Sequence, residues 1–84
     1  MPALIQAAWR GQAPVVEALL AQHVNVNSRD NEEQTALLRA AAEGHATIIK
    51  MLINHNANIE ASNKSGETAL MIAAKMGHLE AVKI

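Results

Sequence analysis

Histidines, carboxylates and serines are the side chains of this 84-residue sequence that could carry out acid–base or nucleophilic chemistry. The four histidines are His23, His45, His55 and His78. His45 and His55 lie ten residues apart, so a helix does not present them as a metal-binding pair at positions i and i+4. His23 and His55 fall in polar stretches and are interpreted as solvated. The spacing of the histidines therefore predicts no metal site.

The acidic and hydroxyl side chains also give no catalytic pattern. The eight carboxylates are Glu17, Asp30, Glu32, Glu33, Glu43, Glu60, Glu67 and Glu80. None lies inside an apolar pattern, where burial would favour a protonated general acid. The serines Ser28, Ser62 and Ser65 lie in turn-like stretches without a histidine suitably placed to activate them, and no glycine-rich phosphate loop is present. We predict no enzyme activity and no cofactor.

Composition favours small helices over a sheet. Half of the residues are hydrophobic, but seventeen are alanine and the only aromatic residue is Trp9. Alanine is a strong helix former and lets helices approach closely. A net charge of −1 gives no electrostatic reason to expect a nucleic acid or an anionic membrane as partner, and the apolar runs are far too short to span a bilayer. The absence of cysteine fits an intracellular, cytoplasmic protein.

A fixed period of 33 residues organises the chain. The stretches TALLRAAAEGH (35–45) and TALMIAAKMGH (68–78) share threonine, leucine, paired alanines, glycine and histidine at equal places. Subtracting 33 from the first stretch reaches a third copy of the pattern, in Leu4, Ala7, Ala8 and Gly11. A constant period over three copies indicates a repeat architecture.

Each copy contains two helical patterns and a polar turn. Leu37, Ala40, Ala41 and Gly44 fall at i, i+3, i+4 and i+7, and Ile48, Ile49, Leu52 and Ile53 form a second apolar stripe. The short connection between the patterns predicts antiparallel neighbouring helices. The stretches NVNSRDNEEQ and ANIEASNKSGE follow as exposed turns. They come after His23 and Asn56, two residue types that tolerate left-handed backbone.

These residues resemble the ankyrin repeat, a 33-residue unit of two antiparallel helices and a long turn that projects as a β-hairpin. The matching residues are Asp30, Thr35, Leu37, Ala40, Ala41, Gly44, His45, Ala57 and Asn58 in the second copy, and Gly66, Thr68, Leu70, Ala73, Ala74, Gly77 and His78 in the third. The resemblance implies an all-α solenoid with projecting β-turn or hairpin loops. It implies one domain over residues 1–84, with repeats at about 1–30, 31–63 and 64–84. It also implies that His45 and His78 hydrogen-bond to tie their loops.

Some positions depart from the ankyrin pattern. Leu38 and Met71 replace the histidine that would bond to the threonine, so we expect the start of each first helix to be less firmly fixed. Glu33, His23 and Asn56 replace glycines, each at a modest cost in turn stability.

The third copy stops within its second helix, which is expected to run from about Leu79 to Ile84. Four apolar residues are then expected to be partly uncovered, namely Leu70, Leu79, Val82 and Ile84. The end repeats of a solenoid need instead a polar outer face. We therefore expect the chain to be part of a longer array, with further ankyrin repeats beyond Ile84.

The resemblance also implies a binding surface for a protein partner, in a concave groove formed by the turn tips and the first helices. The variable positions of that groove are Trp9, Arg10, Arg29, Asn31, Glu32, Gln34, Ala42, Glu43, Ser62, Lys64, Ser65, Glu67, Lys75 and Met76, with Gln6 and Arg39 beside them. Trp9 takes the place of Ala42 and Lys75 in the other copies. It is either an interface anchor or a cover over the end of the array.

Three functions remain open at this point. The leading one is a protein–protein interaction module that presents a rigid surface. The second is a substrate-recruiting segment of a larger enzyme or effector whose catalytic domain lies outside this chain. The third is a structural spacer or a set of capping repeats without a partner of its own.

Overall fold

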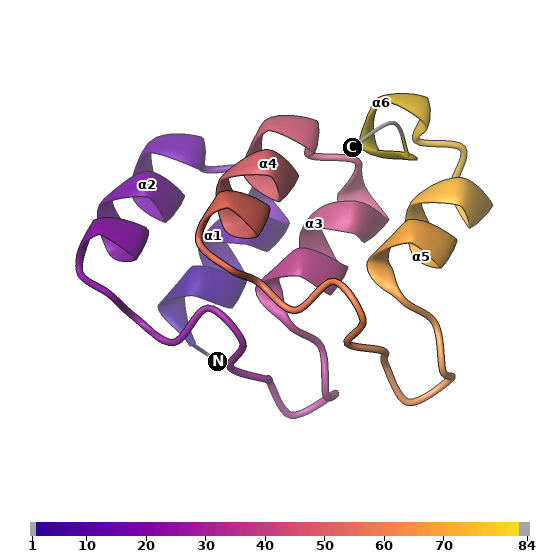
Figure 1. Cartoon of the computed structure of the whole chain (residues 1–84), viewed down its shortest axis with the longest axis horizontal. Helices are drawn as coiled ribbons and strands as arrows, with labels where there is room; N and C mark the ends of the chain where they lie inside the picture. Colours follow the sequence, from indigo (N-terminus) through magenta and orange to yellow (C-terminus); the bar gives the residue numbers. More distant parts are fainter. Residues whose placement is uncertain (1, 83–84) are drawn as a thin grey trace.

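The computed structural model describes residues 2–82 and contains, in that range, three antiparallel helix pairs. The first helices of the pairs are α1 (Ala3–Arg10), α3 (Ala36–Glu43) and α5 (Ala69–Lys75); the second helices are α2 (Ala13–Ala21), α4 (Ala46–Asn54) and α6 (Leu79–Val82). The pairs stack side by side, with α1, α3 and α5 in one layer and α2, α4 and α6 in the other (Figure 1). The predicted all-α solenoid is therefore confirmed.

Small side chains set the spacing of the first layer. Ala7, Ala8, Ala40 and Ala41 are all buried, and α3 packs against both α1 and α5. Alanine has little volume beyond Cβ, so these helices approach closely without leaving cavities. Larger aliphatic residues fill the second layer, where Val16, Leu20, Ile48, Ile49 and Leu52 are buried. The core thus follows the two apolar stripes of the sequence.

Hydrogen bonds fix the start of α3 and α5. The Oγ1 atom of Thr35 accepts from the Leu38 N–H at 3.2 Å, and Oγ1 of Thr68 accepts from the Met71 N–H at 3.4 Å. Each bond satisfies one of the backbone donors that a helix leaves unpaired at its first turn. The threonines therefore cap both helices, although leucine and methionine stand in the histidine position.

Left-handed residues shape the connections. Gly44 ends α3 with φ of 71°, as the sequence predicts. His23, Glu33 and Asn56 have φ of 58°, 59° and 68°, which confirms that they occupy glycine-like positions. The projecting turns are compact, and within residues 2–82 their strand pairing amounts to the isolated antiparallel bridge between Ser62 and Thr68.

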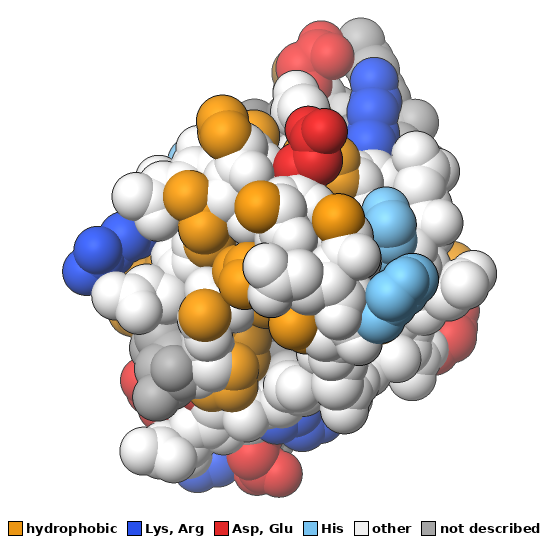
Figure 2. Space-filling view, turned by 90° about the vertical axis from the view of Figure 1, so that its left-hand side faces the viewer, with side chains coloured by type: hydrophobic (Ala, Val, Ile, Leu, Met, Phe, Trp, Pro, Cys, Tyr) orange, Lys and Arg blue, Asp and Glu red, His pale blue; other side chains and the backbone are white. Residues whose placement is uncertain are grey.

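The two ends of the stack expose apolar residues that the middle pair buries. Leu70 is 59% exposed, whereas its counterpart Leu37 is 3% exposed because the third pair covers it. Leu79 is exposed and Val82 is partly buried, as predicted, while the predictions for Ile84 and for the end of α6 lie outside the described residues. At the opposite end Val15 is exposed, and Figure 2 shows hydrophobic side chains across that face.

Candidate functional site

The turn before α3 is organised by Asp30. One carboxylate oxygen, Oδ1, accepts from the backbone N–H groups of Glu32 at 2.8 Å and Gln34 at 3.0 Å. The other, Oδ2, accepts from Nη2 and Nε of Arg39 at 2.9 and 3.2 Å. Burial raises the pKa of Asp30, but hydrogen bonds from Gln34, Arg39 and Glu32 outweigh it and hold this pKa below its ordinary value. Asp30 is therefore an ionised structural group that joins the turn to α3.

Arg39 links this turn to the first helix pair. Its guanidinium carbon lies 4.1 Å from the centroid of the Trp9 ring, a cation–π geometry. Its Nη2 also lies 3.2 Å from the Glu32 carboxylate. The Arg39 side chain is 13% exposed, and Trp9 remains 37% exposed. Trp9 thus packs against the neighbouring helix pair on one side and keeps part of its surface open to solvent.

The third pair repeats this arrangement with different side chains. Asn63, 33 residues after Asp30, accepts through Oδ1 from the N–H groups of Ser65 at 2.9 Å and Glu67 at 3.0 Å. Lys75 forms an ion pair of 3.1 Å with Glu67. Hydrogen bonds from Asn63 and Lys75 lower the pKa of the Glu67 carboxyl. In both turns the side-chain oxygen therefore adds to backbone hydrogen bonds, which the Asp30 N–H donates to the Gln34 carbonyl and the Asn63 N–H to the Glu67 carbonyl, each at 3.0 Å.

A hollow of about 140 Å³ lies between these two clusters. It is lined by Gln34, Arg39, Ala42, Asn63, Glu67, Ile72, Lys75 and Met76. Met76 is 53% exposed at its rim, and buried Ile72 contributes to the lining. The hollow accordingly offers an apolar contact surrounded by paired charges.

Two further sets of contacts hold the pairs in register. Nη1 of Arg29 donates to the carbonyl oxygens of Glu33 at 2.6 Å and of Ser62, in the next turn, at 3.0 Å. The Oδ1 atom of Asn27 accepts from the Asn58 N–H at 2.8 Å, again across one repeat. The projecting turns are thereby tied to one another as well as to their helices.

The repeated histidines also act between pairs. The Nε2 atom of His45 lies 3.1 Å from the carbonyl oxygen of Trp9, and Nε2 of His78 lies 3.0 Å from that of Ala42. Because a carbonyl only accepts, each Nε2 carries the donated hydrogen. The expected hydrogen bonds of these loop histidines are present, and each joins its loop to the end of the first helix in the preceding pair. The reason is that the glycine of that pair, Gly11 or Gly44, leaves room for the ring.

The predicted groove positions are distributed unevenly over these features. Gln34, Ala42, Glu67, Lys75 and Met76 meet at the hollow, and Trp9 and Glu32 meet at Arg39. The remaining predicted residues, Arg10, Arg29, Asn31, Glu43, Ser62, Lys64 and Ser65, line neither feature. Arg29 and Ser62 instead join the two turns.

Arg39 and Asn63 make more contacts at this surface than their place in the sequence pattern indicates. Arg39 was expected only beside the groove, and Asn63 was not singled out at all. The 33-residue spacing from Asp30 to Asn63 was the available signal for Asn63. The contact of Arg39 with Trp9 has no such signal, because it joins residues 30 positions apart.

Within residues 2–82, no group of three or more histidine, cysteine, aspartate or glutamate side chains is placed to hold a metal ion. In that same range, every buried side-chain nitrogen or oxygen has a hydrogen-bond partner. None of the helices described is long and apolar enough to cross a membrane.

A family model for ankyrin repeats, in three copies, matches residues 4–84. The chain belongs to the ankyrin repeat family. Ankyrin repeats are generally non-catalytic modules for protein–protein interaction. No curated protein matches the chain in sequence.

Proposed function

We propose that these ankyrin repeats bind a partner protein through the surface formed by Trp9, Arg39, Glu32 and the hollow beside Met76, here called the groove surface. The observation that carries the proposal is the contact of Arg39 with Trp9, Asp30 and Glu32. These contacts fix an aromatic ring and its neighbours before a partner arrives. Little side-chain entropy is then lost on binding.

The charges of the groove surface narrow the chemistry of the partner. Arg39 is paired with Asp30 and Glu32, and Lys75 is paired with Glu67. Because these pairs are satisfied internally, a strongly charged ligand gains little there. The exposed parts of Trp9 and Met76 are available for apolar contact, and aromatic residues and methionine are enriched in interfaces. We infer a partner segment that inserts an apolar side chain and contacts the rim through neutral polar groups.

Selection from a displayed peptide library tests this proposal. The selected binders are measured by calorimetry against wild type, Trp9→Ala and Met76→Ala. Val15→Ala serves as the matched control, because Val15 is also an exposed apolar residue but lies on α2. We expect Trp9→Ala to weaken binding by at least about tenfold, the loss typical of an interface anchor, and Val15→Ala to leave it unchanged.

The folding of each variant is checked by far-UV circular dichroism before affinity is compared. A salt titration provides a second test, since affinity that depends on apolar contact changes little between low and moderate ionic strength. Binders that retain full affinity for both groove variants, or that respond to Val15→Ala instead, would show that the groove surface is not the binding site.

A further inference from the structure

A polar pocket of about 300 Å³ lies at the carboxyl ends of α2 and α4, apart from the groove surface. It is lined by Leu20, His23, Val24, Val26, Asn54, His55 and Asn56. None of these residues belongs to the hollow beside Met76 or to the Trp9 cluster. The pocket is therefore separate from the groove surface that we propose for partner binding.

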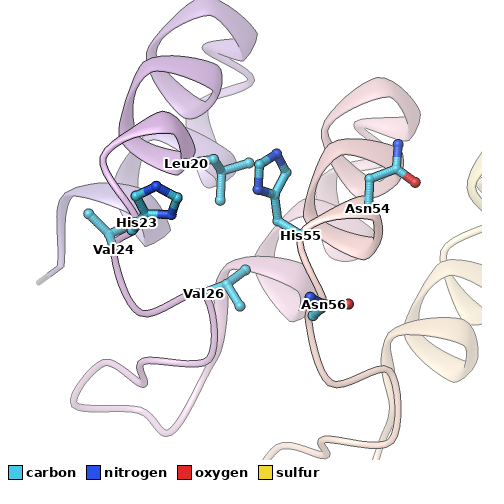
Figure 3. Close-up of a pocket in the computed structure, with 7 residues that line it drawn as sticks. All are labelled: Leu20, His23, Val24, Val26, Asn54, His55 and Asn56. Atoms are coloured by element: carbon cyan, nitrogen blue, oxygen red, sulfur yellow. The ribbon is translucent and has the colours of Figure 1, made fainter.

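Two histidines from successive repeats meet in this pocket. His23 follows α2 in a left-handed conformation, and its N–H donates to the Leu20 carbonyl at 3.1 Å. His55 is the C-cap residue directly after α4, and its N–H donates to the Leu52 carbonyl at 3.1 Å. Figure 3 shows the two rings on either side of the Leu20 side chain, whereas the Asn54 side chain points away from them. Hydrogen bonds of the helix ends thus hold both backbones that carry the rings.

These imidazoles differ from those of the other two histidines. His45 and His78 each use Nε2 to bond to a main-chain carbonyl. Within residues 2–82, no hydrogen bond or ion pair engages a ring nitrogen of His23 or His55. Both residues are exposed, so their nitrogens are accessible from solvent. The stacking of the repeats thus places two histidines with accessible ring nitrogens in the lining of one pocket.

The ring nitrogens of the two histidines indicate which class of metal ion the pocket could bind. Neutral imidazole nitrogen is a good ligand for divalent first-row transition metals, whereas Mg²⁺ and Ca²⁺ prefer several oxygens. The pocket lining contains no carboxylate and no cationic side chain. We propose that His23 and His55 together chelate one divalent transition metal ion of the Zn²⁺ type, with water completing its coordination.

The repeat period supplies matched substitutions. The residue 33 positions after His23 is Asn56, and the residue 33 positions before His55 is Gln22. His23→Asn and His55→Gln therefore introduce the side chains that another repeat already carries at those places. Asn56 itself has φ of 68°, so asparagine suits the left-handed backbone at position 23.

Calorimetric titration of the whole chain with Zn²⁺, in a non-chelating buffer, tests the proposal. We expect one binding site, an affinity lower by at least about tenfold in each single variant, and no binding in the double variant. Titration with Mg²⁺ is expected to give no binding. His78→Gln serves as a control that removes a histidine outside the pocket and leaves Zn²⁺ affinity unchanged.

Nuclear magnetic resonance gives a test that needs no variant. Substoichiometric Ni²⁺ is expected to broaden the ring resonances of His23 and His55 before those of His45 and His78. Absence of Zn²⁺ binding to the wild type at millimolar concentration, persistence of binding in the double variant, or equal broadening of all four histidines would each overturn the proposal.

Discussion

Replacing Arg39 by alanine removes the side chain that connects the first two repeats at the groove surface. The Asp30 carboxylate, whose side chain is 3% exposed, loses its guanidinium partner but keeps two backbone donors. Loss of hydrogen bonds to a charged group costs about 1.5–3 kcal/mol, and loss of a partly exposed cation–π contact costs about 0.5–1 kcal/mol. The pair with Glu32 contributes little, because the Glu32 side chain is 73% exposed.

We therefore expect Arg39→Ala to lower the free energy of unfolding by about 2–4 kcal/mol, a large fraction of the roughly 4–12 kcal/mol available to a domain of this size. Urea unfolding followed by circular dichroism measures this loss. The fluorescence of Trp9 gives a second, local signal of unfolding, since Trp9 is the only aromatic residue in the chain. Arg39→Lys should lose about half as much, because lysine keeps the charge but not the planar donor fork.

Arg10→Ala is the matched control, since Arg10 is an exposed arginine on a first helix and lies outside the Trp9–Asp30 cluster. It is expected to change the stability by less than about 0.5 kcal/mol. If Arg39→Ala lowers the free energy of unfolding no more than Arg10→Ala does, Arg39 does not stabilise the contact between the first two repeats. A double-mutant cycle with Trp9→Leu then separates the ring contact from the Asp30 bonds.

The remaining predictions concern a glycine and the response to acid. Gly44→Ala should destabilise the chain more than Gly66→Ala. Both glycines have positive φ, so the backbone strain of an alanine is similar at the two positions. A Cβ atom at position 44 would lie 2.7 Å from the His78 ring, whereas a Cβ atom at position 66 would have no neighbour within 4 Å. Thermal unfolding compares the two variants, and equal melting temperatures would contradict this account of the histidine contact. Because the folded-state pKa of Asp30 is lowered, its stabilising contribution is present above the ordinary value of 3.8 and is lost as the pH falls through the folded-state pKa. Urea titrations from about pH 6 to pH 2 should therefore show a smaller loss of stability in Asp30→Asn than in the wild type, and identical profiles would argue against the ionised role of Asp30.

The sequence by itself determined the features that depend on neighbouring residues. The 33-residue period and the apolar stripes predict the helix pairs, because helix formation and burial repeat at short, regular spacings. His23, Glu33 and Asn56 could be placed in left-handed turns because each occupies a position where the repeat pattern has glycine. The threonine caps follow from Thr35 and Thr68 standing directly before the first helices.

Only the tertiary structure decided which residues of different repeats touch one another. His45 meets the carbonyl of Trp9 across 36 positions, and Arg39 meets the Trp9 ring across 30. His23 and His55 enter one pocket although their spacing in the sequence suggests no site. These contacts depend on the stacking of the pairs and on the reach of individual side chains. Local periodicity fixes the backbone of each repeat, but it does not specify where a long side chain crosses to the next one.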